Sequence, residues 1–180
     1  MTQEIIIAGF GGQGVLSMGK TLAYSGLMEN KEVSWYPSYG PEQRGGTSNV
    51  TVILSDKMIS SPIVNSFDVA IILNQPSLDK FEKTVKPGGI LIFDPNGIQN
   101  FPTRKDIQIY SIAANDAAIE LENSKIMNMI VLGGVLKVAP MVSIEGVMSG
   151  LKNSLPERHH KLLPINEKAL NKGMEIIERL

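Results

Sequence analysis

Residues 4–14, Glu-Ile-Ile-Ile-Ala-Gly-Phe-Gly-Gly-Gln-Gly, decide the fold of this chain. The continuous apolar run that ends in glycines predicts a buried strand over 4–10. Apolar residues then recur near a 3.6-residue period and predict a helix over 14–29. A buried strand that leads through a glycine-rich turn into a helix is typical of the first unit of an α/β domain.

Short β-branched runs and helical patterns alternate along the rest of the chain. Strands are predicted over 32–36, 47–54, 68–73, 89–93 and 107–112, and helices over 77–85, 113–122, 126–138, 144–151 and 166–180. The polar stretch 155–164, bounded by prolines, is interpreted as a loop. We therefore expect a single domain over 1–180, a three-layer αβα sandwich with a mainly parallel, Rossmann-like sheet and a helical C-terminal third.

The composition excludes several classes of function. The 180 residues are 43% apolar and 19% charged, which fits a globular protein. A formal net charge of -1 gives no sign of a nucleic-acid partner or a membrane-surface partner. The absence of Cys excludes a disulfide, a thiolate-ligated metal site and a cysteine nucleophile within this chain. The first residues lack the features of a signal peptide and no apolar run could span a bilayer, so we expect a cytoplasmic protein.

The two histidines offer little for metal or acid–base chemistry. His159 and His160 are adjacent, so their side chains point apart on a helix or a strand. The flanking Arg158 and Lys161 make the segment cationic and unfavourable for a metal ion. We interpret the pair as part of a solvated loop and predict no metal site in this chain.

A first glycine motif, G-x-G-x-x-G at 9–14, suggests dinucleotide binding. Its place between a strand and a helix would bring backbone N–H groups to a phosphate. The dinucleotide interpretation also requires an acidic residue at the end of the second strand. Glu32 has roughly the right spacing but stands at the start of that strand, so the pattern favours this function only weakly.

A second motif, G-x-x-x-x-G-K-T at 14–21, suggests a nucleotide-binding P-loop. A P-loop begins at the end of the strand and has small, flexible residues between its glycines. Here Val15, Leu16 and Met18 belong to the apolar face of a helix, which would place Lys20 about two turns into it. Asp94, at the end of an apolar run, resembles a magnesium-binding residue but is better explained as the start of a turn.

A third pattern combines the glycine loop with the segment 39–49, Tyr-Gly-Pro-Glu-Gln-Arg-Gly-Gly-Thr-Ser-Asn. Nucleotide-binding folds do not require this second loop, and loops held by a rigid sheet often carry binding residues. Together, G-x-G-G-Q-G-V at 9–15 and Y-G-P-E-x-R-G-G at 39–46 resemble the two signatures of the gamma subunit of 2-oxoacid:ferredoxin oxidoreductases. Further matches, such as Lys86-Pro87-Gly88-Gly89 and Asn128-Met129, extend the resemblance over nearly the whole chain.

The resemblance implies a component of an enzyme that converts a 2-oxoacid, coenzyme A (CoA) and oxidised ferredoxin to acyl-CoA, CO2 and reduced ferredoxin. The substrate would be 2-oxoglutarate or a branched-chain 2-oxoacid. Thiamine diphosphate, magnesium and iron–sulfur clusters would belong to partner subunits, because this chain has no Cys and no G-D-G…N stretch of the kind that binds thiamine diphosphate. The expected partners are alpha and beta subunits, a ferredoxin-like subunit and ferredoxin itself. The related small subunit of indolepyruvate oxidoreductase is an alternative.

The candidate site therefore consists of interface or ligand loops, and we predict no catalytic residue in this chain. The glycines would allow close approach of the backbone, Gln13 would hydrogen-bond across an interface or else cap the helix, and Arg44 would reach a phosphate or a carboxylate. The candidate residues are Gly9, Gly11, Gly12, Gln13, Gly14, Tyr39, Gly40, Pro41, Glu42, Arg44, Gly45, Gly46, Thr47, Ser48 and Asn49.

Overall fold

The computed structural model describes residues 1–40 and 46–180. Its strands are β1 (Thr2–Phe10), β2 (Glu32–Tyr39), β3 (Thr47–Ser55), β4 (Phe67–Ile72), β5 (Val85–Phe93), β6 (Gln108–Ser111) and β7 (Glu178–Arg179). Its α-helices are α1 (Val15–Met28), α2 (Gln75–Phe81), α3 (Ala114–Glu120), α4 (Met127–Val138), α5 (Ile144–Ser154) and α6 (Leu163–Ile176). Short 3-10 helices connect several of these elements.

The strands form one sheet in the order β2-β3-β1-β4-β5-β6-β7. β1, β4, β5 and β6 are parallel neighbours, and β2 runs in the same direction because it lies antiparallel to β3, which lies antiparallel to β1. Only β3 and β7 run the other way within the described sheet. The expected mainly parallel, Rossmann-like sheet is therefore confirmed.

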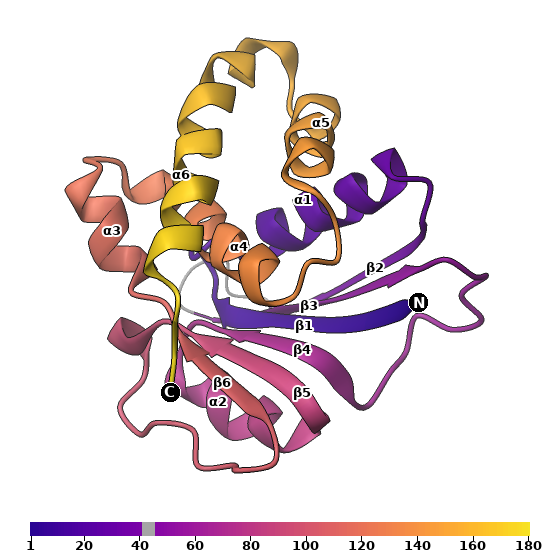
Figure 1. Cartoon of the computed structure of the whole chain (residues 1–180), viewed down its shortest axis with the longest axis vertical. Helices are drawn as coiled ribbons and strands as arrows, with labels where there is room; N and C mark the ends of the chain where they lie inside the picture. The colour runs from indigo at the N-terminus through magenta and orange to yellow at the C-terminus, as the bar shows by residue number, and fades with distance from the viewer. Residues whose placement is uncertain (41–45) are drawn as a thin grey trace.

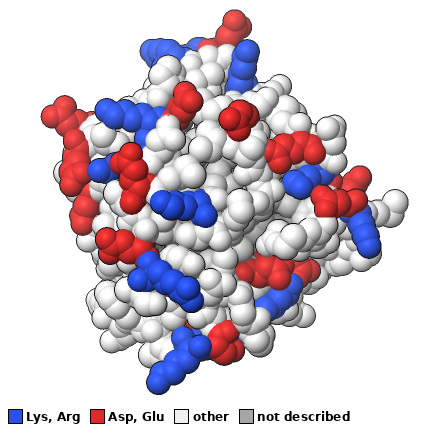
Figure 2. Space-filling model, in the orientation of Figure 1, with Lys and Arg blue, Asp and Glu red and all other residues white. Residues whose placement is uncertain are grey.

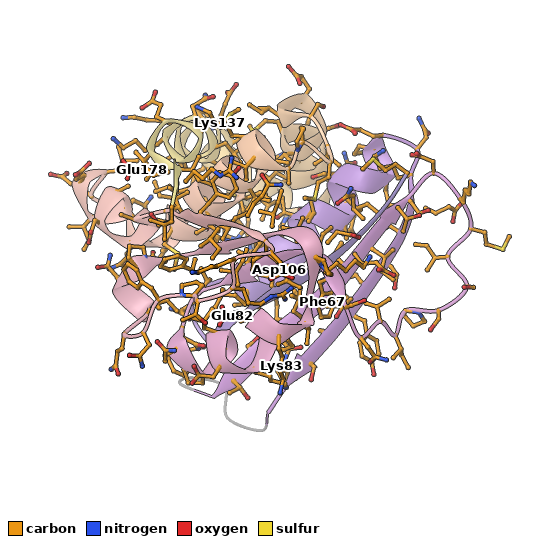
Figure 3. The ribbon with its side chains drawn as sticks, turned by 60° about the horizontal axis from the view of Figure 1, so that its bottom comes forward. Phe67, Glu82, Lys83, Asp106, Lys137 and Glu178 are labelled. Carbon is orange, nitrogen blue, oxygen red and sulfur yellow. The ribbon has the colours of Figure 1, made fainter. Side chains whose placement is uncertain are left out.

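Helices cover the two faces of the sheet unequally (Figure 1). α1 and α4 lie next to the sheet on one face, and α5 and α6 pack outside them. The opposite face holds α2, whose Phe81 packs edge to face on Phe67 at the start of β4, with ring centroids 6.4 Å apart. Figure 3 shows Phe67 on this side of the sheet and Lys137 on the side of the thick helical layer. The αβα arrangement and the helical C-terminal third agree with the prediction.

α4 and α6 cross at very short range because each contributes a glycine to the crossing. A Cβ atom on Gly133 would collide with the carbonyl oxygen of Leu170, and one on Gly173 would collide with that of Ile130. Only hydrogen fits at both positions. This contact fixes the C-terminal third of the chain against the centre of the helical layer.

The structure corrects the predicted end of the chain. The predicted last helix over 166–180 begins earlier, at Leu163, and ends at Ile176. Glu178 and Arg179 then pair antiparallel with β6, because the edge of β6 offers backbone partners to the returning chain. The predicted loop over 155–164 contains a 3-10 helix, Glu157–Leu162, in which His160 Nε2 lies 3.1 Å from the Leu155 carbonyl oxygen.

Candidate functional site

The glycine loop lies at the carboxyl end of β1, beside the carboxyl end of β4. From β1 the chain passes through α1 to β2 on one side of the sheet, and from β4 it passes through α2 to β5 on the other. The gap between two such strands is a topological switch point, where open α/β sheets usually bind their ligands. The predicted loop therefore lies where this fold most readily forms a site.

Two glycines in the loop have backbone conformations that favour glycine. Gly12 has φ +100° and Gly14, the N-cap of α1, has φ +76°. A Cβ atom on Gly14 would also lie 2.9 Å from the Cβ atom of Asn128, in the first turn of α4. Asn128 lies in the predicted helix over 126–138 and is a half-buried neighbour of the glycine loop.

Gln13 joins the ends of β1 and β4. Its Oε1 accepts a hydrogen bond from the Phe10 N–H at 2.6 Å, and its Nε2 donates to the Leu73 carbonyl oxygen at 3.1 Å. A Cβ atom on Gly9 would lie 2.6 Å from the same Oε1, so the amide also requires a glycine there. Both polar ends of Gln13 form hydrogen bonds within the chain, so it does not cap α1, and a bond across an interface stays a prediction.

The second loop returns to the first. The Gly11 N–H donates to the Gly46 carbonyl oxygen at 2.9 Å, which joins the two signature segments directly. The first residues of β3, Thr47, Ser48 and Asn49, stand opposite the end of β1 in antiparallel register. The described ends of the two loops therefore lie together at the end of β1.

The second loop is described at its two ends, residues 39–40 and 46–49. Tyr39 ends β2 with a largely exposed side chain, and the Gly40 N–H donates to the Thr47 carbonyl oxygen at 3.4 Å. Ser48 is buried, and Asn49 is half-buried. The predicted site residues Pro41, Glu42, Arg44 and Gly45 lie outside the described residues.

The geometry does not support either nucleotide motif. Lys20 and Thr21 lie in the second turn of α1, away from the end of β1, and Lys20 Nζ lies 5.8 Å from the ring centroid of Tyr24. Glu32 opens β2, whose other end, at Tyr39, is the end beside the glycine loop. A ribose held by Glu32 could not belong to a dinucleotide whose phosphates meet Gly11 or Gly14.

Asp94, which resembles a magnesium-binding residue in the sequence, instead fixes the backbone of the segment that follows β5. Its carboxylate accepts from the backbone N–H groups of Asn96 at 2.9 Å and Asn115 at 3.0 Å. Burial raises the pKa of this carboxyl above its ordinary value, while these hydrogen bonds oppose the shift and nearby Asp116 adds to it. Asp94 thus fixes a turn and the start of α3, as the turn interpretation predicts.

Sequence reasoning missed Asn74, at the carboxyl end of β4. Its Oδ1 accepts from the Ser77 N–H at 2.9 Å and caps α2. Its Nδ2 is buried and has no hydrogen-bond partner among the described residues. An Asn directly before Gln-Pro, after an apolar run, is an N-cap signal that could have identified it.

The start of α1 brings positive charge from the backbone to the glycine loop. Within the described residues, no side chain caps the first turn of α1, so its free N–H groups and the positive end of the helix dipole face the switch point. Acidic and basic side chains are interspersed over the face shown in Figure 2. The described parts of the chain hold no group of three or more His, Asp or Glu residues that could bind a metal ion.

A family model described as pyruvate ferredoxin/flavodoxin oxidoreductase matches residues 4–176. The chain belongs to this family. It is 38% identical over 173 residues to ketoisovalerate oxidoreductase subunit VorA of Methanothermobacter marburgensis, covering 96% of this chain and 36% of that protein. It is 32% identical over 183 residues to 2-oxoglutarate synthase subunit KorC of Methanocaldococcus jannaschii, covering 100% of this chain and 96% of that protein.

Solved structures of family members share the fold. A keto/oxoacid ferredoxin oxidoreductase gamma subunit from Geobacter sulfurreducens has a TM-score of 0.83 at 25% identity, covering 99% of each chain. A 2-oxoglutarate:ferredoxin oxidoreductase from Magnetococcus marinus has a TM-score of 0.86 at 23% identity, covering 97% of this chain and 31% of that one. The family therefore includes proteins of about this length and proteins in which this unit is about a third of a longer chain. In the described ranges, none of this family member's helices is both long and apolar enough to cross a bilayer.

Proposed function

We propose that this chain, as one domain over 1–180, is the gamma subunit of a cytoplasmic 2-oxoacid:ferredoxin oxidoreductase. The complex would convert a 2-oxoacid, CoA and oxidised ferredoxin to acyl-CoA, CO2 and reduced ferredoxin. The observation that carries the proposal is the hydrogen bond from Gly11 to Gly46, which joins the two signature loops at the switch point of the sheet. Relatives with 2-oxoglutarate and ketoisovalerate in their names favour a substrate of one of those two classes.

In this proposal the chain supports the chemistry without carrying its cofactors. It has no Cys to ligate an iron–sulfur cluster, so the clusters would be held by other subunits. Thiamine diphosphate with its magnesium ion would likewise be bound by alpha and beta subunits, and the two loops would pack beside that site. A ferredoxin-like subunit would pass the electrons to ferredoxin.

We also propose that the glycine loop contacts CoA. The start of α1 combines free backbone N–H groups with a positive helix end, and at Gly12 the backbone is open to close approach. Phosphate groups of CoA are the part of that substrate suited to such a surface. A Cβ atom on Gly12 would meet nothing within 4 Å, but its φ of +100° strains any other residue, so Gly12→Ala tests the backbone conformation of the loop and not its packing.

Anaerobic affinity purification of the tagged chain from its native host tests the subunit proposal. We expect stoichiometric recovery of a thiamine-dependent subunit and a ferredoxin-like cluster protein, identified by mass spectrometry. Recovery of the chain alone, as a stable monomer, would contradict the proposal. Titration of that monomer with Mg-ATP or NAD would then test the nucleotide-binding alternatives, which predict micromolar affinity.

A further inference from the structure

No strand of the described residues pairs with the outer edge of β2, and this strand carries three exposed aromatic residues. β2 is the terminal strand of the sheet and is eight residues long, whereas β7 at the other edge has two residues. Edge strands are usually protected by shortness, by charges or by proline, because their free backbone groups can pair with another chain. β2 has one charged residue, Glu32, and one proline, Pro37.

The hydrogen bond from the Gly40 N–H to the Thr47 carbonyl oxygen shows which backbone groups of β2 are free. Backbone groups alternate in direction along a strand, so even-numbered residues of β2 face β3 and odd-numbered residues face outward. Val33, Trp35 and Tyr39 therefore direct both N–H and C=O groups away from the sheet. Pro37, which lacks an N–H group, occupies an outward position, as expected of proline on an edge.

The aromatic side chains flank this edge on both faces of the sheet. Trp35 and Tyr39 are 40% and 68% exposed on the face that holds α1, and Tyr36 is 49% exposed on the opposite face. Trp35 is the only Trp of the chain. Trp and Tyr are the residues most enriched at the energetic centres of protein interfaces, so a strand added to β2 would be covered by aromatic rings on both sides.

Pro37 distinguishes a foreign strand from a second copy of this chain. In a two-fold antiparallel pairing of β2 with itself over residues 33–39, both copies of Pro37 would enter the new ladder, and two donors would be missing. A foreign strand meets this defect once and can place a residue there that needs no donor. The edge is therefore better suited to a different chain than to a dimer.

We propose that β2 is extended by a strand of the thiamine diphosphate-binding subunit, which adds an eighth strand to the sheet. The partner is chosen by continuity, because β2 runs directly into the Tyr39–Gly46 segment that the proposed function places beside that subunit. The inference rests on that proposed function. It adds the surface and the mode of recognition, in which backbone hydrogen bonds give affinity and the aromatic pockets give specificity.

Hydrogen–deuterium exchange of the isolated chain and of the anaerobically purified complex tests this directly. In the isolated chain the amides of Val33, Trp35 and Tyr39 face solvent, so a peptide covering 32–39 exchanges them early. We expect the complex to lower the early uptake of this peptide by up to these three amides. A peptide covering 47–55 is the internal control, because β3 is already paired on both sides.

Two substitutions of Tyr39 distinguish the contribution of its backbone N–H group to binding from that of its ring. Tyr39→Ala removes the ring and keeps the outward N–H group, whereas Tyr39→Pro removes both, and neither touches the groups that face β3. We expect Tyr39→Pro to bind the partner subunits about fivefold more weakly than Tyr39→Ala, the effect of one net hydrogen bond. Unchanged uptake over 32–39 in a complex that does assemble would overturn the inference alone, whereas failure of the wild-type chain to recover any subunit would contradict the proposed function.

Discussion

Gln13 occupies a position at which a neutral amide satisfies both neighbours. The Phe10 N–H requires an acceptor, and the Leu73 carbonyl oxygen requires a donor. The sequence marked Gln13 as a candidate, but its partner at Leu73 stands 60 residues later, so its role depends on the register of β1 with β4. That register follows from tertiary packing and could not be inferred locally.

The substitution Gln13→Glu tests this bridge. The carboxylate keeps the acceptor for Phe10 and loses the donor, so an oxygen then faces the carbonyl oxygen of Leu73. We expect a loss of about 1–3 kcal/mol in the free energy of unfolding, the cost of an unsatisfied and partly buried polar group, measured by urea denaturation of the isolated chain. The same change at exposed Gln99 is the control, and equal stability of the two variants would contradict the assigned role.

At the scale of elements, periodicity predicted the existence and type of most helices and strands, because the sheet core is continuous in apolar residues and the helices bury one face. The predicted ends of elements are wrong where pairing with a distant strand decides the end of an element. Residues 177–180 continue a helical pattern in sequence, yet β6 recruits Glu178 and Arg179 as a strand. The composition of 39–46 predicts a loop, whereas the role of Asn74 depends on where α2 begins, which periodicity alone does not locate.

The crossing of α4 and α6 gives a prediction at this scale. Gly173→Ala forces a methyl group into the carbonyl oxygen of Ile130, so the helices must separate. We expect the free energy of unfolding to fall by about 3 kcal/mol or more, which is at the upper end of the range for overpacked sites. Lys168→Ala, an exposed change on the same helix, should stay within about 0.5 kcal/mol of the wild type in the same thermal or urea denaturation.

The contact between β5 and α3 gives a pH dependence. Burial raises the pKa of Asp94 in the folded chain, so the folded state binds more protons than the unfolded state between the ordinary and the raised value. The contribution of Asp94 to stability therefore falls as the pH rises from about 4 through the raised pKa. The free energy of unfolding of the wild type minus that of Asp94→Asn should therefore fall as the pH rises over this window. A rise of this quantity with pH would contradict the raised pKa.

At the scale of the molecule, the two faces of the sheet have separate apolar cores. The larger core joins the sheet to α1, α4, α5 and α6, and the smaller one joins it to α2. Fold class and layers could be predicted from the alternation of elements, but the strand order could not. The order depends on β3 turning back beside β1, which local pattern does not encode.

Truncation separates the contributions of the last two elements. Removing 178–180 deletes a two-strand pairing at the sheet edge and should lower stability by about 1 kcal/mol while the chain remains folded. Removing 163–180 deletes α6 and uncovers the glycine face of α4, so we expect the cooperative unfolding transition to disappear in circular dichroism. A cooperative transition in the longer truncation would show that the helical layer is stable without α6.

The glycine crossing of α4 with α6 also has a consequence for biosynthesis. The partner of Gly133 and Ile130 is supplied by α6, which follows α4 in the chain and therefore leaves the ribosome after it. Until α6 has emerged, the nascent polypeptide exposes the surface of α4 that α6 later covers. Chaperone engagement and docking with sister subunits would therefore begin before the helical layer has closed.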